Sequence, residues 1–66
     1  MEFVTIIISP RHKEFFIQAI EDCCLKCYET GKTVIDGDIF IEYTVEYKAV
    51  FEIFILGQSY ANNRRR

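Results

Sequence analysis

The run from Ile39 to Ile55 constrains the fold most, because every second residue in it is apolar and the phase never slips. A two-residue period places alternate side chains on opposite faces of a β-strand. The run also contains no glycine, proline, asparagine or aspartate that would mark a turn. We therefore predict an antiparallel sheet with one apolar face, which consists of Ile39, Ile41, Tyr43, Val45, Tyr47, Ala49, Phe51, Ile53 and Ile55.

Two arrangements satisfy this pattern. One is a hairpin that turns near residues 46–48, so that Val45 faces Ala49 and Tyr43 faces Phe51. The other is a single bent strand, which would span roughly 55–60 Å and would need a second chain to pair with it. Such a length far exceeds the ~11 Å radius of gyration of so small a domain. The second arrangement would make an intertwined dimer, and the sequence leaves both open.

The N-terminal part predicts a strand followed by a helix. Residues 2–8 are mostly β-branched or aromatic, with apolar side chains on both faces, which indicates an inner strand. Ser9 and Pro10 then favour a helix start, and we expect the helix to continue to Glu29, before Thr30 and Gly31 end it. Its apolar side would consist of Phe16, Ile17, Ala19, Ile20, Cys23, Cys24, Cys27 and Tyr28.

The rest of the chain completes the expected fold. Asp36 and Gly37 form a favoured type I′ hairpin turn. We predict an α+β fold of the order β-α-β-β, with an optional further strand, in which one helix packs on an antiparallel sheet. Residues 1–57 would form this single domain, and residues 58–66 a flexible basic C-terminal tail. A chain of 66 residues buries only about 60% of its unfolded surface, so we expect a homodimer to complete the core.

Charge and hydropathy narrow the classes of partner. The net charge is −2 although Arg64, Arg65 and Arg66 contribute +3, so residues 1–63 carry −5. Phosphate binding depends on clustered Lys and Arg, so we expect no nucleic-acid partner beyond weak phosphate contact through these three arginines. We expect no signal peptide and no membrane span, because the apolar stretches are far shorter than the ~20 residues that a span needs. The expected location is the cytoplasm.

The reactive residue types predict neither a cofactor nor a metal site. Cys23, Cys24 and Cys27 are close in sequence, but an odd number does not fit a disulfide framework. A zinc site needs four ligands, and the single histidine, His12, lies far away in the sequence. We interpret the cysteines as small buried hydrophobes, with a metal shared across a dimer or redox chemistry as alternatives. The sequence shows no nucleophile–base pair and no phosphate-binding loop, so we expect a protein that is not an enzyme.

Several apolar residues are left over from the predicted core. Four of them lie on the even face of the predicted sheet, between glutamates and a lysine. Apolar anchors within a charged rim are typical of a contact surface. The interface candidates are Phe15, Leu25, Phe40, Val50, Phe54 and Leu56.

The main hypothesis is a noncatalytic protein–protein interaction module. It would be a regulator or inhibitor that binds a larger protein through its sheet face or an edge strand. In size and acidity it is similar to small regulators carried by viruses and mobile elements, which is an analogy without a matched motif. One alternative is a nucleic-acid-associated protein that acts through the arginine tail. Another is an oligomeric enzyme or ligand-binding protein with a pocket between protomers, lined by His12, Tyr28, Tyr43 and Tyr47.

Overall fold

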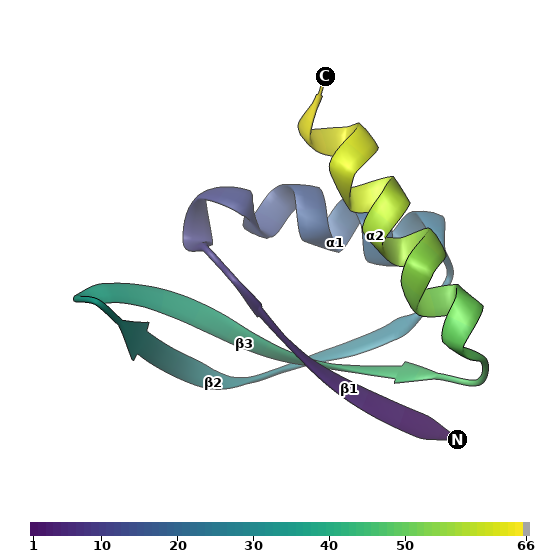
Figure 1. Cartoon of the computed structure of the whole chain (residues 1–66), viewed down its shortest axis with the longest axis horizontal. Coiled ribbons are helices and arrows are strands. Elements are labelled where there is room, and N and C mark those ends of the chain that lie inside the picture. The colour runs from purple at the N-terminus through teal and green to yellow at the C-terminus, as the bar shows by residue number, and fades with distance from the viewer. Residues whose placement is uncertain (66) are drawn as a thin grey trace.

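A computed structural model describes residues 1–65 and shows two helices on one side of a three-stranded sheet (Figure 1). The molecule measures 34 × 30 × 15 Å along its principal axes. The elements along the chain are β1 (Glu2–Ile8), a 3₁₀ turn (Pro10–His12), α1 (Lys13–Asp22), β2 (Lys26–Ile35), β3 (Asp38–Tyr47) and α2 (Val50–Arg64).

The sheet has the order β1-β3-β2, and β3 runs antiparallel to both of its neighbours. β1 and β2 therefore run in the same direction on either side of β3, and α1 connects them, which is the connectivity of a split β-α-β unit. The α+β class and the β-α-β-β order are confirmed. The prediction that residues 2–8 form an inner strand is wrong, because β3 takes the central place and β1 is an edge.

The hairpin between β2 and β3 forms at the predicted turn. Ile35 pairs with Asp38, which leaves a two-residue loop. Asp36 has a φ of 51° and Gly37 a φ of 82°, as a type I′ turn requires at both central positions. The register of β2 shifts once, between Glu29 and Gly31, so this edge of the sheet carries a β-bulge.

The first helix starts at Pro10 as predicted, although its first turn is a 3₁₀ turn, but α1 ends at Asp22 rather than at Glu29. Cys24 adopts the left-handed conformation with a φ of 55°. Its N–H donates to the Glu21 carbonyl at 3.1 Å, and the Leu25 N–H donates to the Ile20 carbonyl at 3.1 Å. These two hydrogen bonds form a Schellman motif. The helix thus ends at a cysteine where glycine would normally stand.

The alternating pattern of residues 39–55 belongs to two different elements. Along β3 it is a strand pattern, and Ile41, Tyr43 and Val45 face the helices and are buried. From Val50 onward the same alternation lies on α2, so the hairpin near residues 46–48 and the single long strand are both wrong. The intertwined dimer that followed from the long strand loses its basis, and the sheet carries two helices instead of one.

Backbone hydrogen bonding explains where α2 begins. The Glu52 carboxylate accepts hydrogen bonds from the N–H groups of Lys48 at 2.7 Å and Ala49 at 2.8 Å, and the Glu52 N–H donates to the Ala49 carbonyl at 3.0 Å. Glu52 therefore satisfies backbone donors that precede the first turn. These two hydrogen bonds are the main reason that the pKa of Glu52 lies below its ordinary value.

Residues 58–64 continue α2, so the tail predicted from residue 58 is wrong as far as Arg64. Tyr60 packs with its ring near that of Phe16, at a centroid distance of 6.4 Å. The guanidinium carbon of Arg64 lies 5.5 Å from the centroid of the Tyr60 ring. Arg65 is exposed and ends the helix, while Arg66 lies outside the described residues.

The core lies between the sheet and the two helices. It centres on Phe16 and Val45, the largest fully buried side chains, and the ring centroids of Phe16 and Tyr43 are 4.9 Å apart. The Tyr43 hydroxyl is buried without a hydrogen-bond partner among residues 1–65, and burial raises the pKa of this phenol. The other buried apolar residues are Ile8, Ala19, Ile20, Ile41 and Leu56. Neither of the described helices has the length and hydropathy to cross a membrane.

Candidate interaction surfaces

The face of the sheet opposite the helices carries the first apolar surface (Figure 1). The strand register places the side chains of Phe3, Ile7, Tyr28 and Phe40 on this face. Phe3 is 59% exposed and Tyr28 is 51% exposed, while Phe40 is half-buried. We call this surface the open sheet face.

Polar side chains lie between these apolar residues. The Thr30 hydroxyl donates to the Glu42 carboxylate at 3.1 Å, and the Thr44 hydroxyl lies 3.5 Å from that of Thr30. Glu46 pairs with Phe3 on one side and with Lys26 on the other. The open sheet face therefore combines aromatic anchors with two glutamates on its central strand, which gives it a partly negative character.

The second apolar surface lies on α2, on the side turned away from the core. Val50, Phe51, Phe54 and Ile55 recur there at helical spacing, and Phe54 is 70% exposed. We call these four residues the outer face of α2. On the inward side of the same helix, half-buried Ile53 and buried Leu56 pack against the core, so the N-terminal half of α2 is apolar on both sides.

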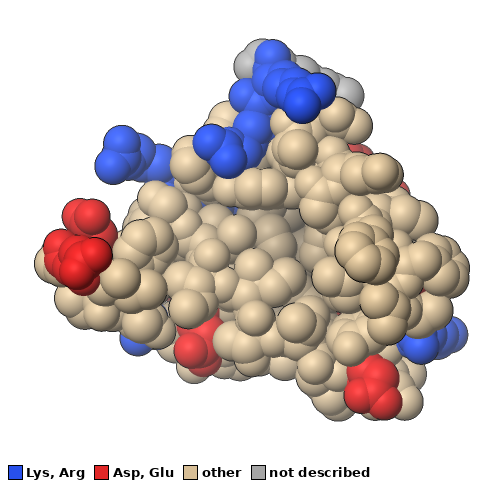
Figure 2. All heavy atoms as spheres, in the orientation of Figure 1, with Lys and Arg blue, Asp and Glu red and all other residues tan. Residues whose placement is uncertain are grey.

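An apolar groove of about 230 Å³ lies between α2 and β1. Its walls come from Ile6 and Ile8 of β1, from Phe16 of α1, and from one side of α2 between Ile53 and Tyr60. β1 and α2 are the elements nearest the viewer in Figure 1. Figure 2, in the same orientation, shows that charged side chains lie around the margin of this side and that its middle is hollowed. An area without charged side chains thus extends over the groove and the adjoining middle parts of β1 and α2.

The six predicted interface residues do not form one surface. Phe40 lies on the open sheet face, Val50 and Phe54 lie on the outer face of α2, and Leu56 is buried in the core. Phe15 and Leu25 are half-buried: Leu25 packs against the core, and the Phe15 ring centroid is 6.1 Å from that of His12.

The sequence reasoning missed residues that contribute most to both surfaces. The sequence pattern places Phe3 and Ile7 in an inner strand and Tyr28 in a helix, so it predicts none of them at a surface. It places Phe51 on the buried face of a strand. For α2, the helical spacing of Ile53, Leu56 and Tyr60 was the available signal, but it becomes visible only when the pattern is continued past Gly57.

The four residues proposed to line a pocket between protomers do not come together in one chain. Tyr43 is buried beside Phe16, Tyr28 lies on the open sheet face, and Tyr47 is at the end of β3. The His12 ring lies 6.4 Å from that of Tyr60. No acid–base pair results from this arrangement.

The cysteines also fail to converge on a site. Cys23 and Cys27 are half-buried and pack against the core, whereas Cys24 is exposed. Burial raises the pKa of the Cys23 thiol, with a further contribution from the nearby Asp22 carboxylate, and burial alone raises that of Cys27. Both thiols are therefore less nucleophilic at neutral pH. Residues 1–65 contain no group of His, Cys, Asp or Glu side chains placed to hold a metal ion.

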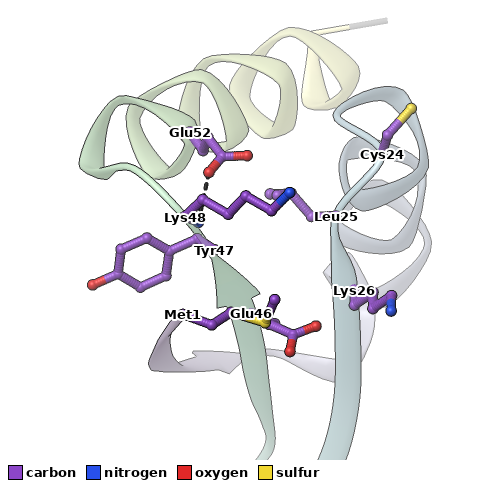
Figure 3. A pocket seen from close by; sticks show the side chains of 8 residues that line it. All are labelled: Met1, Cys24, Leu25, Lys26, Glu46, Tyr47, Lys48 and Glu52. Carbon is purple, nitrogen blue, oxygen red and sulfur yellow. Dashed lines mark hydrogen bonds between the residues drawn. The ribbon is translucent and has the colours of Figure 1, made fainter.

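A shallow cavity of about 290 Å³ lies where β2 begins, β3 ends and α2 starts (Figure 3). Lys26, Glu46 and Lys48 contribute charged groups to its walls. Figure 3 shows the Tyr47 ring and the Cys24 thiol pointing outward on opposite sides, while the Lys48 side chain extends toward Leu25. The carboxylate of Glu52 in this cavity is engaged with backbone N–H groups.

Comparison with known proteins gives no relative of this chain: no family model matches it, and neither the curated proteins nor the solved structures yield a match.

Proposed function

We propose that this protein is a noncatalytic binding module that acts by covering a surface of a larger protein with its open sheet face. The observation that carries the proposal is the exposure of Phe3 and Tyr28 beside the glutamates of β3 on an uncovered sheet. Aromatic residues are enriched at the centres of protein interfaces, where they act as anchors. Such a module would regulate or inhibit its partner by occupying a surface that the partner needs for its own interactions.

The charges indicate which partner surface would fit. Glu42 and Glu46 lie on the central strand of the open sheet face, and residues 1–63 carry a net charge of −5. A partner with apolar pockets rimmed by Lys or Arg would be electrostatically complementary, which raises the association rate and disfavours acidic partners. We therefore expect binding to weaken as the salt concentration rises.

A comparison of two variants on one strand tests the proposal. Tyr28→Glu places a charge on the open sheet face. Val34→Glu is the matched control, because Val34 is 67% exposed on the same strand but on the opposite face. A protein captured from host lysate would be purified, and its affinity for each variant measured by calorimetry. We expect Tyr28→Glu to weaken binding on the order of 30-fold, as loss of an interface anchor does.

The control defines the outcome that would contradict the proposal. Val34→Glu should bind the purified partner as the wild type does. If both variants bind it equally well, or if Val34→Glu alone loses it, the open sheet face is not the binding surface. Circular dichroism of all three proteins ensures that the comparison is made between folded molecules.

A further inference from the structure

We propose that two copies of this chain associate through β1 and α2, so that the two sheets join edge to edge into one six-stranded sheet. This inference goes beyond the proposed function and does not depend on it, because it uses the free edge of β1 and the helix α2, and the joined sheets would leave the open sheet face uncovered. It starts from a difference between the two edges of the sheet. Unprotected edge strands pair readily with another strand, and proteins usually protect them with bulges, lysines or prolines.

β2 has such protection and β1 does not. The β2 edge carries Lys26, Lys32 and the register shift between Glu29 and Gly31. β1 pairs with β3 without a break over seven residues, and its only charged residue is Glu2 at one end. Among residues 1–65 no strand pairs with the free side of β1. β1 is therefore the edge at which a second chain would add.

The sequence of β1 is complementary to itself in antiparallel pairing. With Thr5 at the two-fold axis, Phe3 of one copy would lie opposite Ile7 of the other, since directly opposed residues are symmetric about the centre. Both of these residues belong to the open sheet face. In the same register Val4 would lie opposite Ile6, and both of these face the helices. Apolar residues would thus meet apolar residues on both faces.

The charges favour the same pairing. In this register each Glu2 would lie opposite an Ile8, so the two carboxylates are at opposite ends of the joined strands, roughly 20 Å apart at the rise of a β-strand. Parallel pairing would instead place Glu2 beside Glu2, and like charges directly opposite each other are destabilising. The antiparallel arrangement also gives a closed two-fold dimer, in which no free β1 edge is left to recruit a third copy.

α2 and the groove extend the contact above the joined strands. The groove opens on the same side as β1, in the middle area that carries no charged side chains (Figure 2), and the exposed Phe54 projects from the helix that forms one of its walls. Gly57 lies in that wall, and a Cβ at this position would meet no atom within 4 Å. A two-fold axis at Thr5 would bring the outer face of one α2 toward the groove of the other copy, so that a large side chain from each fills the hollow of its partner.

The surface area is consistent with a second copy as the occupant. The chain exposes 4778 Å², whereas a compact monomer of its mass of 7.8 kDa would expose about 4,400 Å². A standard interface needs about 800 Å² from each partner, roughly a sixth of the exposed total. A two-fold contact over β1, the groove and α2 would also complete the core of a chain too short to form a large one alone.

Oligomeric state and two substitutions on α2 test the proposal. Sedimentation velocity over a concentration series should show a dimer for the wild type. Phe54→Glu should raise the dimer dissociation constant on the order of 30-fold, whereas Val34→Glu, a change at similar exposure on the distant hairpin, should not change it. Gly57→Leu adds a side chain to the wall of the groove, at a position where a Cβ meets no atom within 4 Å, and it should also favour the monomer.

Disulfide trapping tests the register of β1 independently of α2. Thr5→Cys places two thiols at the two-fold axis, where opposed Cα atoms of an antiparallel pair lie about 4.5–5.5 Å apart, a spacing that a disulfide accommodates. In a Cys24→Gly background, which removes the exposed native thiol, mild oxidation should give a covalent dimer. Val34→Cys in the same background should give much less.

Four results would overturn the proposal. A wild type that is monomeric at all concentrations would exclude it, as would equal effects of Phe54→Glu and Val34→Glu on the dissociation constant. A dimer that forms without cross-linking through Thr5→Cys would exclude the β1 register. Hydrogen exchange provides the last test: if β1 becomes protected only when a different protein is added, β1 binds that protein and not a second copy.

Discussion

α1 and α2 pack on the same face of the sheet, but they use their apolar residues differently. α1 has ten residues, directs Phe16, Ala19 and Ile20 into the core, and leaves polar side chains in solvent. α2 has fifteen residues, of which only Leu56 and Asn63 are buried. Its outer face exposes four further apolar side chains. α1 is therefore an ordinary amphipathic helix, whereas the N-terminal half of α2 is apolar on both sides.

This difference indicates which part of the molecule is incomplete. A helical segment that is apolar on two opposite sides normally has both of them buried. α2 is covered by α1 on one side, where the Ser59 hydroxyl also donates to the Asp22 carboxylate at 3.4 Å. The other side is left exposed beside the groove. One copy thus buries the apolar side of α1 but only one of the two apolar sides of α2. This difference is the basis for proposing that a second copy covers the other side.

The largest expected effect is a difference in stability between substitutions of apolar residues on the two helices. Phe16→Ala should destabilise the fold by about 3–5 kcal/mol, because it removes a fully buried aromatic side chain and leaves a cavity. Phe54→Ala should change the stability of the monomer by less than about 0.5 kcal/mol, because this side chain is exposed. Urea denaturation of both variants at low protein concentration measures the difference. A comparable loss for Phe54→Ala would mean that the outer face of α2 is buried within one copy.

The sequence predicted the α1 side of the molecule better than the α2 side. β1, the helix start at Pro10, the Asp36–Gly37 turn and the buried side of β3 follow from local patterns that agree with the final packing. For Cys27 and Tyr28, the spacing fitted the apolar side of a helix, but they alternate across β2 instead. The decisive feature was the left-handed residue at Cys24, which has no glycine or asparagine to indicate it.

The α2 side could not be predicted because its apolar residues fit both the two-residue period of a strand and the 3.6-residue period of a helix. Residues 50–56 are rich in β-branched and aromatic side chains, which favour strands, and they extend an unbroken alternation from β3. The helix depends on tertiary contacts of Leu56 and Tyr60 with α1, which override local preference. The open sheet face was missed in part for a related reason, since β1 was expected inside the sheet and not at its edge.

The start of α2 offers the next largest effect. Ala49 precedes the helix with a φ of −132° and a ψ of 144°, which suits an N-cap residue, but alanine has no side-chain acceptor. Ala49→Ser should stabilise the protein by about 1 kcal/mol, because the hydroxyl accepts a hydrogen bond from a first-turn N–H. Thermal unfolding measures the change. Ala61→Ser, within α2, is the control and should be slightly destabilising; an equal gain from both would exclude the capping explanation.

α1 ends at a left-handed position where glycine is preferred but a cysteine stands, whereas α2 contains a glycine in its interior, where other residues are preferred. Replacing each by the preferred type of residue should stabilise the protein. Cys24→Gly relieves a left-handed cysteine at the end of α1, and Gly57→Ala removes a flexible residue from within α2, where a Cβ meets no atom within 4 Å. Each should add about 0.5–1 kcal/mol. Urea denaturation in the Phe54→Glu background separates this effect from association. Cys24→Ala is the control and should bring no gain, since alanine keeps the backbone strain.

The smallest effect concerns the pH dependence of α2 relative to α1. Backbone hydrogen bonds lower the pKa of Glu52 in the folded state, so its contribution to stability is fully present above the ordinary glutamate pKa of about 4.3 and is lost as the pH falls through the folded-state value. Wild type should therefore lose more stability than Glu52→Gln between pH 5 and pH 3, a range chosen to span that transition. Glu14→Gln, in the first turn of α1, is the matched control, because Glu14 makes no such pair of hydrogen bonds within residues 1–65. If Glu52→Gln and wild type show the same acid dependence of stability in urea titrations, the Glu52 carboxylate does not stabilise the first turn of α2. The first turns of the two helices would then not differ in this respect.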